Sequence, residues 1–503
     1  MQKPPKKRAC VSVGAVGVFE RLMQIPAIGK FTLEKLKASA FNSFHIPLST
    51  ALENQTSILS KKLEMLEKTA IGKKLGVNIK TDFADLPFTD YNFYAPFYDN
   101  PSPDAFMYPL EEYVTIQTSG TTGKNKSFLI PRTAIKKVLR QTALPVICAL
   151  FHDGEKITLE YGDTFYLNVG PAPYLSGTMF TAGSKAKTVP FLKLTPNINL
   201  SYKEKVDYFI LNYKVINAAW LTASTLITQI IPQIKEPIKL KGLILMDDLV
   251  ARTHKAEIAE FTGTIPKTVY SSTETVSPSI PSVQYSMGFI FDPRRGIFEF
   301  IPYNSDKSQE KTIGLDEVEV GKIYRLIYTD LVGELTRYDT TNSFKCIAKG
   351  DNIINTDFPV FEYHSRLDAT LSIMNFTRIG ETELLEAFRA IGLEIVEFTT
   401  KIKTDGGHEY IQFYIELMDK RPKQQIEGKI HQYLYTHNKD YKSVSDSFAY
   451  TPMKLTLLPK NTFVNYLENK KGGTFAKVCR VNISDEELGQ LLSVTNSSTK
   501  SGS

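Results

Sequence analysis

The chain has 503 residues, of which 42% are hydrophobic and 23% charged, and its formal net charge at pH 7 is +6. This length is too great for one ordinary core, so we expect two or three domains. The composition is typical of a globular protein, and so small a charge gives no reason to expect a nucleic-acid partner.

The cysteines and the apolar runs narrow the class of protein further. Cys10, Cys148, Cys346 and Cys479 show no C-x-x-C spacing and no nearby cluster of histidines. They predict free thiols in a reducing compartment, with neither a zinc site nor a disulfide framework. No apolar run reaches the roughly 18 residues that a membrane span requires, and no convincing signal-peptide cleavage site follows the basic start. We therefore expect a cytoplasmic protein without a membrane span.

The first half of the chain alternates between helical and strand-like patterns. An apolar face with helical spacing predicts a helix from Ser49 that ends at Gly72 or Gly76. Residues 82–109 are rich in Asp, Pro, Phe and Tyr and predict an irregular segment. Further strands are predicted at 113–116, 166–169, 218–221 and 243–246, and further helices at 133–144, 203–213, 224–234 and 248–261. Such alternation predicts an α/β domain of layered sheets and helices.

The second half predicts antiparallel strands and then a smaller α+β unit. Residues 268–345 contain β-rich runs joined by turns, as in hairpins. A helix at 381–393, a hairpin over Asp405-Gly406-Gly407 and a second helix at 423–436 follow. We expect a leader at 1–48 that is partly flexible, a large domain at 49–363, a small mobile domain at 364–494 and a disordered tail at 495–503.

A loop rich in small, hydroxylic and basic residues follows the first of these predicted strands. It is made of Thr118, Ser119, Gly120, Thr121, Thr122, Gly123, Lys124, Asn125 and Lys126. Glycines let the backbone approach a ligand closely, and successive N–H groups form a concave nest for phosphate oxygens. A loop of this composition is otherwise an ordinary surface turn. It lacks the G-x-x-x-x-G-K-[ST] pattern of the standard nucleotide P-loop.

The order of these residues resembles the phosphate loop of the adenylate-forming superfamily, [ST]-S-G-[ST]-T-G-x-P-K. One position departs, because Asn125 stands where proline is usual. The resemblance implies a large N-terminal adenylate-forming domain, a smaller C-terminal domain, and the use of ATP and Mg²⁺. Within it, Thr118 to Lys124 and Lys126 would hold the phosphates.

A second segment, Tyr270-Ser271-Ser272-Thr273-Glu274, resembles the Y-x-x-T-E motif of the same superfamily. Nucleotide chemistry needs an aromatic face for adenine and a carboxylate for Mg²⁺. The resemblance implies that Tyr270 lies against the adenine, that Thr273 contacts the α-phosphate and is catalytic, and that Glu274 reaches the metal. Ser272 is included among the nucleotide-binding residues.

Three later segments resemble superfamily motifs less completely. The run from Gly333 to Asn342 resembles Y-[RK]-T-G-D, whose aspartate holds the ribose hydroxyls, but Asn342 replaces that aspartate, Thr341 the glycine and Asp339 the base. Either Asn342 or Asp339 could contact the ribose. Arg366 lies in a segment that resembles the G-R-x-D hinge between the domains. Lys477 occupies the place of the C-terminal catalytic lysine.

Within the superfamily, the chain is similar to the plant auxin-responsive acyl acid amido synthetases and their microbial relatives over roughly residues 50–482. The residues that support this are 53–55, 73–76, 82–87, 287–300, 333–338 and 475–480. The resemblance implies a ligase that adenylates a carboxylic acid and passes the acyl group to an amine, most plausibly of an amino acid. An acyl-CoA ligase and a catalytically degenerate nucleotide-binding protein remain the alternatives. The sequence indicates no oligomeric state.

Overall fold

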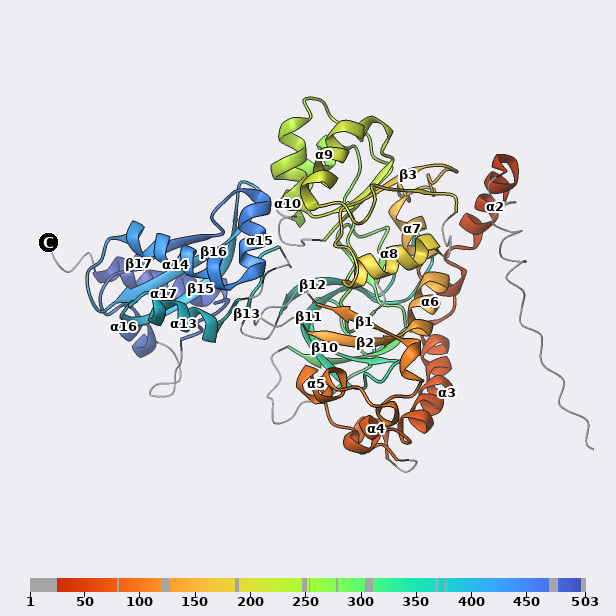
Figure 1. Cartoon of the computed structure of the whole chain (residues 1–503), viewed down its shortest axis with the longest axis horizontal. Helices are drawn as coiled ribbons and strands as arrows, with labels where there is room; N and C mark the ends of the chain where they lie inside the picture. The colour runs from red at the N-terminus through yellow and green to blue at the C-terminus, as the bar shows by residue number, and fades with distance from the viewer. Residues whose placement is uncertain are drawn as a thin grey trace, which may run out of the picture.

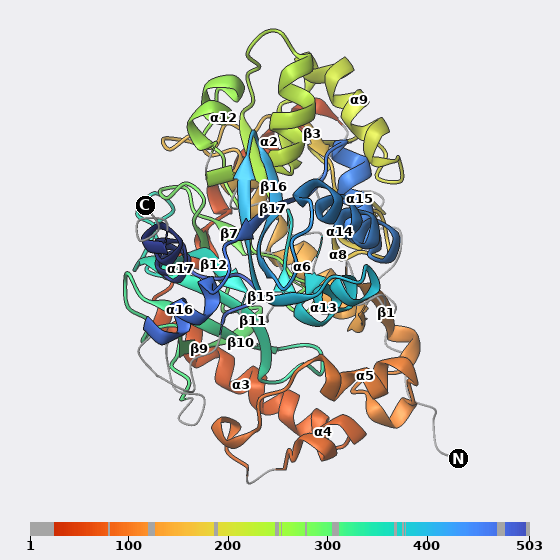
Figure 2. The same ribbon diagram turned by 90° about the vertical axis from the view of Figure 1, so that its left-hand side faces the viewer.

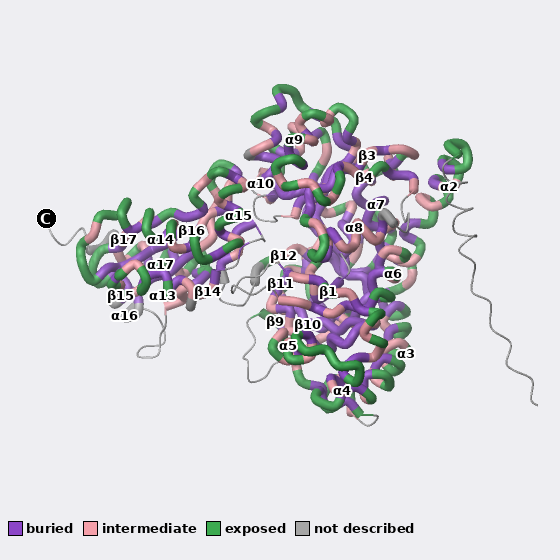
Figure 3. The backbone as a smooth tube through the Cα atoms, in the orientation of Figure 1, coloured by how far each residue is buried: buried purple, intermediate pink, exposed green. Residues whose placement is uncertain are grey.

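The structure is a computed structural model that shows two lobes. It describes residues 25–498 apart from 79–80, 119–125, 186–189, 247–250, 253, 277–278, 304–310, 367–369, 375–376, 378 and 470–477. The large lobe is formed by the part of the chain before residue 367, and the small lobe by the C-terminal part drawn in blue (Figure 1). Figure 3 shows that each lobe has its own buried interior, in purple.

A parallel sheet of four strands lies in the upper part of the large lobe. Its strands are β3 (Thr164–Leu167), β4 (Lys193–Thr195), β5 (Ala218–Leu221) and β6 (Gly242–Leu245), in the order β4-β3-β5-β6. These strands are short apolar runs, as expected where helices cover a parallel sheet. The helices between and beside them include α8 (Leu175–Lys185), α9 (Tyr202–Asn212), α10 (Ala223–Thr225) and α12 (Lys255–Thr262). The strands predicted at 166–169, 218–221 and 243–246 therefore exist.

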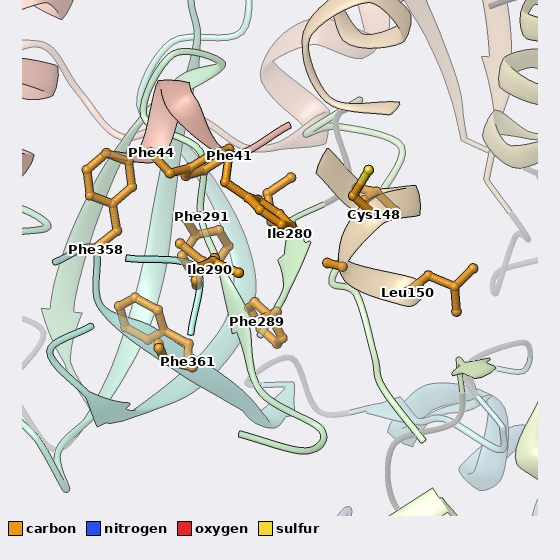
Figure 4. Packing of buried hydrophobic residues seen from close by; sticks show 14 of the residues in the cluster. Phe41, Phe44, Cys148, Leu150, Ile280, Phe289, Ile290, Phe291, Phe358 and Phe361 are labelled. Atoms are coloured by element: carbon orange, nitrogen blue, oxygen red, sulfur yellow. The ribbon is translucent and has the colours of Figure 1, made fainter. Parts of the chain in front are cut away.

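The second sheet of the large lobe is antiparallel and has six strands. It contains β7 (Ile280–Pro281), β8 (Phe289–Ile290), β12 (Val360–Arg366), β11 (Tyr338–Ala348), β10 (Ile323–Asp330) and β9 (Gly296–Pro302), in that order. Its aromatic interior is joined by residues from the leader, as Figure 4 shows for Phe41 and Phe44. The Phe44 and Phe358 ring centroids are 5.7 Å apart. The hairpins predicted between residues 268 and 345 are confirmed.

Helices and a two-stranded hairpin complete the large lobe. The hairpin pairs β1 (Tyr113–Gln117) with β2 (Ser127–Pro131). The helices are α2 (Pro26–Ser39), α3 (Leu48–Leu66), α4 (Ala70–Leu75), α5 (Tyr91–Asp99), α6 (Arg132–Gln141) and α7 (Ala143–Leu150).

The helix predicted from Ser49 is in fact two helices. The Thr69 hydroxyl accepts a hydrogen bond of 3.0 Å from the Gly72 amide, which starts α4, and Gly76 ends it with a positive φ of 81°. The prediction that residues 82–109 are irregular was wrong at α5. There Asp90 caps the helix by accepting from the Phe93 amide.

The small lobe is built on a three-stranded sheet. β15 (Ile395–Asp405) and β16 (His408–Leu417) form the predicted hairpin, and β17 (Met453–Leu458) lies parallel to β16. A short pair, β13 (Thr370–Leu371) with β14 (Ile379–Gly380), precedes it. The helices are α13 (Glu381–Ala390), α14 (Lys423–His437), α15 (Lys439–Phe448), α16 (Thr462–Asn469) and α17 (Asp485–Ser498). Figure 2 shows this lobe in front of the large one.

Two expected domain limits, the disordered tail and the boundary between the domains, can be compared with the structure. The expected disordered tail was wrong for residues 495–498, because α17 continues through them; residues 499–503 lie outside the described part. The boundary between 363 and 364 stays a prediction, although the large-lobe sheet continues to Arg366. Of the helices that the structure describes, none is long and apolar enough to cross a membrane.

Candidate functional site

A cavity of about 800 Å³ lies where the two lobes meet. The large lobe contributes most of its wall, and the small lobe contributes residues of α15 and of the segment after β13. Most of the nucleotide-binding residues predicted from sequence and covered by the structure line this cavity. They are Thr118, Tyr270, Ser272, Thr273, Glu274 and Asn342.

The predicted phosphate loop connects the two strands of the β1–β2 hairpin. Thr118 and Lys126 form its base, where the Thr118 amide donates a hydrogen bond of 2.9 Å to the Lys126 carbonyl. Thr118 is buried, and the Lys126 ammonium lies 5.1 Å from the centre of the Tyr91 ring. Ser119, Gly120, Thr121, Thr122, Gly123 and Lys124 lie outside the described residues. The hairpin therefore fixes where the loop begins and ends at the edge of the cavity.

Tyr270 lies between an aromatic cluster and the cavity. Its ring stacks on Phe289 with centroids 6.0 Å apart and meets the Phe344 ring edge-on at 4.7 Å. Its hydroxyl accepts a hydrogen bond of 3.1 Å from the Asn342 side-chain amide. Two segments predicted separately from sequence are thus in direct contact.

The residues after Tyr270 form a tight turn that faces the cavity. Ser272 and Thr275 exchange hydrogen bonds within this turn, including one of 3.1 Å between their hydroxyls. Glu274 follows in the same turn and is 9% exposed. Within the described part of the chain, no hydrogen bond or ion pair is made to its carboxylate. Its carboxylate oxygens are therefore available to a ligand at the cavity wall.

Asn342 and Asp339 have different surroundings, although they are only three residues apart on β11. Asn342 lines the cavity and bonds Tyr270. The Asp339 carboxylate accepts from the Thr341 amide at 2.8 Å and lies 3.7 Å from the Arg325 guanidinium. Thr341 has a positive φ of 56°, which is strained for a β-branched residue and is a conformation that glycine adopts freely. The structure thus brings Asn342, and not Asp339, to Tyr270.

Of the last two predicted residues, Arg366 and Lys477, the structure describes only the Arg366 backbone. The Arg366 backbone pairs in register with Asn342, since β12 lies beside β11; its side chain is not among those described. Lys477 lies outside the described residues.

Sequence reasoning missed the apolar end of the cavity and the part of its wall beyond the nucleotide motifs. The apolar end is lined by Val138, Leu139, Val146, Ile147, Leu150, Phe165, Met179, Phe180 and Leu194. The small lobe adds Met374, Asp440, Ser443, Val444, Ser447 and Phe448. One sequence feature could have indicated this part of the cavity wall. The strand predicted at 166–169 is followed by a turn, and ligands commonly bind at the carboxyl ends of parallel strands.

Part of the six-stranded sheet of the large lobe matches a known protein family. Residues 289–366, which run from β8 to the end of β12, match the GH3 family central domain. They include both Asp339 and Asn342, and the strand that ends at Arg366.

Relatives of known function match the chain over part of its length. A jasmonoyl–L-amino acid synthetase of Nicotiana attenuata is 29% identical over 176 residues, which are 31% of this chain and 29% of that protein. A jasmonoyl–L-amino acid synthetase of rice (Oryza sativa subsp. japonica) is 28% identical over 251 residues, or 43% of this chain and 40% of that protein. The matched stretch thus spans less than half the length of these relatives.

Two solved structures share the fold of nearly the whole chain. A 2-hydroxyisobutyryl-CoA ligase gives a TM-score of 0.60 at 14% identity, covering 92% of this chain and 94% of that one. An acyl acid amido synthetase gives a TM-score of 0.50 at 14% identity, covering 91% and 95%. These matches confirm the predicted fold class, a large lobe of layered sheets and helices with a smaller α+β lobe. The match to the GH3 family central domain and the relatives named jasmonoyl–L-amino acid synthetases confirm the resemblance to acyl acid amido synthetases.

Proposed function

We propose that this protein activates a carboxylic acid with ATP to an acyl-adenylate and then transfers the acyl group to an amine. The hydrogen bond between Asn342 and Tyr270 carries the proposal, because it joins the expected ribose and adenine segments in one cavity. Thr118 and Glu274 line the same cavity, where phosphates and a cation would be held. Its apolar end has the character expected of an acyl-binding site.

Catalysis in this arrangement is mainly positional and electrostatic. Thr118, at the base of the phosphate loop, and Thr273, in the turn after Tyr270, both line the cavity. Hydroxyl and N–H donors there would offset the charge that develops as a carboxylate oxygen attacks the α-phosphorus. Lys477 would add a point charge to the same reaction.

Glu274 fits the role of a Mg²⁺ ligand. Mg²⁺ prefers oxygen ligands and is usually bound by one or two carboxylates together with substrate phosphates. Glu274 meets this condition because its buried carboxylate faces the cavity without a hydrogen-bond partner among the described residues. Those residues contain no group of three acidic, histidine or cysteine side chains that could hold a metal alone. The cation would supply charge to the nucleotide phosphates.

Thioester formation with coenzyme A is the second candidate. One observation favours it: the 2-hydroxyisobutyryl-CoA ligase, which shares the fold at a TM-score of 0.60, was solved with both its acyl-adenylate and CoA. The acid-amine ligase remains our first choice, because the relatives that match by sequence are amino acid synthetases. A protein that binds ATP without catalysis is the third possibility, motivated by Thr341 and Asn342.

Pyrophosphate exchange tests the adenylation step. The purified chain, ATP, Mg²⁺ and a panel of carboxylic acids should give exchange with at least one acid. A chain that binds ATP and exchanges with none would contradict the ligase proposal. Amide formation with an amino acid panel, assayed beside thioester formation with CoA, then separates the two acceptors.

A further inference from the structure

The apolar end of the cavity lies between the parallel sheet and three helices. Phe165 on β3 pairs with Leu194 on β4. Leu167, on the same side of β3 as Phe165, pairs with Trp220 on β5, so these side chains share one face of the sheet. The opposite wall comes from α6, α7 and α8, and α6 lies against both other helices (Figure 1). The described side chains of this end are uncharged, and a charged group would be costly to bury there without a partner.

One face of α8 runs along the cavity from the nucleotide end to the apolar end. Ser176, Phe180 and Gly183 line the cavity, at a spacing that places residues on one face of a helix. The helix begins beside the phosphate-loop hairpin, where the Gln117 amide donates to the Pro173 carbonyl at 3.1 Å. A rise of about 1.5 Å per residue puts Gly183 roughly 10 Å beyond Ser176 along the helix axis. Gly183 therefore lies in the apolar end, away from the phosphate loop.

Neither the backbone nor the packing of the described residues requires a glycine at position 183. Gly183 has a helical backbone without a positive φ, and glycine is among the least favourable residues within a helix. A Cβ atom at Gly183 would meet one described atom outside its own helix within 4 Å, the Leu139 Cδ2 at 3.3 Å. By contrast, a Cβ atom at Gly177 in the same helix would lie 2.1 Å from the Pro171 backbone. The missing side chain at Gly183 therefore leaves space at the cavity wall.

Partly exposed apolar side chains surround this space. Leu139, on α6, lines the cavity and is only half-buried. One turn before Gly183, the Phe180 ring meets the Trp220 ring edge-on, with centroids 5.6 Å apart. Both rings are also partly exposed, although they pack against the core of the large lobe. Apolar surface left uncovered inside a cavity is what a hydrophobic ligand covers on binding.

We infer that Gly183 determines the size of the acid substrate, because the apolar end of the acid occupies the space that a side chain at this position would fill, opposite Leu139. The inference rests on the proposed function, since it places the reacting carboxylate at the nucleotide end of the same cavity. The acid is then uncharged beyond that carboxylate and long enough to reach Gly183, roughly 10 Å beyond Ser176. Gly183 is thus a specificity-determining residue that takes no part in the reaction itself.

The first test compares acids of increasing length. Pyrophosphate exchange is measured with the unbranched monocarboxylates from acetate to decanoate and with phenyl-substituted acids of increasing chain length. The kcat/KM of the wild type should rise to one preferred acid and exceed that for acetate by about tenfold or more, since one methylene group in an apolar pocket is worth about 10- to 200-fold. Equal use of acetate would overturn the inference. Preference for a dicarboxylate of the same length would also overturn it.

Variants assign the preference to this position. Gly183→Val should lower kcat/KM for the preferred acid by about 10- to 100-fold and move the preference to a shorter acid, with little change for acetate. Gly183→Ala should shift the preference less, in the same direction, and decides alone if Gly183→Val does not fold. Gly428→Val, at an exposed helical glycine of α14, should leave the preference unchanged. An equal loss for every acid, or an unchanged preferred length in the folded Gly183 variants, would sink the assignment.

A compensating variant tests whether the effect is steric. Leu139→Ala removes the side chain opposite Gly183 and should move the preference to a longer acid. Combined with Gly183→Val, it should return the preferred length toward that of the wild type, since residues in contact have coupled effects. A double variant with the same preference as Gly183→Val would refute the placement of the acid between these two residues.

A binding measurement separates this inference from the proposed function. The chain contains a single tryptophan, Trp220, which lines the cavity, and a bromine atom quenches indole fluorescence on contact. Acids of the same lengths with a bromine at the terminal carbon are titrated into the wild type and Gly183→Val. Quenching that weakens in the variant, without pyrophosphate exchange by any acid, would refute the ligase and retain the site. Exchange without quenching, and with the same preferred length in the variant, would retain the ligase and refute the site.

Discussion

The side-chain amide of Asn342 donates a hydrogen bond of 3.1 Å to the hydroxyl of Tyr270, although 72 residues separate the two in the chain. Asn342 also donates to the Thr340 carbonyl at 3.0 Å, so both amide hydrogens are used. The amide oxygen is therefore the part of Asn342 with which a ribose hydroxyl would interact.

The first prediction follows from this pair. Asn342→Asp should keep or improve ATP affinity, because an ionised acceptor makes the stronger hydrogen bond and the Tyr270 hydroxyl can donate to it. Asn342→Ala should weaken ATP binding by about 1–2 kcal/mol. Asp339→Ala should have little effect, since that carboxylate is directed to Thr341 and Arg325. Calorimetric titration of ATP measures all three; a large loss in Asp339→Ala alone would move the ribose contact there.

Glu274→Gln should abolish Mg²⁺-dependent pyrophosphate exchange and leave the thermal unfolding temperature nearly unchanged. The reason is that the carboxylate makes no hydrogen bond or ion pair with any residue that the structure describes, so its charge serves a ligand and not the fold. Glu260→Gln, at an exposed position on α12, is the matched control. Wild-type exchange in Glu274→Gln across a Mg²⁺ titration would refute the metal assignment.

A third prediction concerns the phosphate loop. Ser119→Ala combined with Lys126→Ala should slow adenylation without unfolding the protein, because one oriented donor to a developing charge is worth roughly 10²–10³ in rate. Lys136→Ala, an exposed lysine on α6, removes a similar charge away from the loop. Equal pyrophosphate exchange in the double variant and the control would make the loop an ordinary surface turn.

Two buried lysines predict how stability varies with pH. The Lys62 ammonium donates to the Asp330 and Leu335 carbonyls at 2.6 Å, and the Lys267 ammonium donates to the Ala149 carbonyl at 2.7 Å. Burial is the main cause that lowers the pKa of each lysine to about 8.

Because these pKa values are lower in the folded chain than in the unfolded one, the unfolded state holds more protons above pH 8. The two lysines should therefore make the folded state more stable as the pH rises from about 8 toward 10. Urea unfolding at several pH values measures the slope, and Lys62→Met combined with Lys267→Met should reduce it. An identical slope in the double variant would show that these lysines do not titrate in this range.

The contact between the lobes can be tested by removing one ring. The Phe448 ring lies 5.5 Å from that of Tyr202, and the Gln229 side chain donates to the Ser447 carbonyl at 2.6 Å. Phe448→Ala should loosen this contact and increase the radius of gyration measured by small-angle X-ray scattering. Met418→Ala, an exposed position of the small lobe, should not. No difference between the two variants would mean that the ring does not hold the lobes together.

The sequence predicted best where a local pattern decides the structure. The run Ala218–Leu221 is apolar throughout and forms β5 with those bounds. The helix α5 escaped prediction because Pro96 lies inside it and its aromatic residues show no simple apolar face. Motif resemblance found the nucleotide segments, but it could not choose between Asn342 and Asp339. That choice depends on how β11 bends at Thr341.

The burial of Lys205 could not be predicted from sequence. A lysine near the start of a helix is ordinarily solvated, and nothing local marks Lys205 as buried, although it is 2% exposed. Its burial follows from the position of α9 against the cavity.

The pairing of Asn342 with Arg366 has a mechanical consequence. β12 ends the large-lobe sheet and leads into the small lobe, while β11 carries the residue that meets Tyr270. The two strands are paired by backbone hydrogen bonds. A rotation of the small lobe must therefore either be taken up by backbone changes on the C-terminal side of Arg366 or displace Asn342. Nucleotide binding at Asn342 and the orientation of the small lobe should therefore influence each other through β11 and β12. A bound nucleotide should slow amide hydrogen exchange at Arg366, which it need not touch.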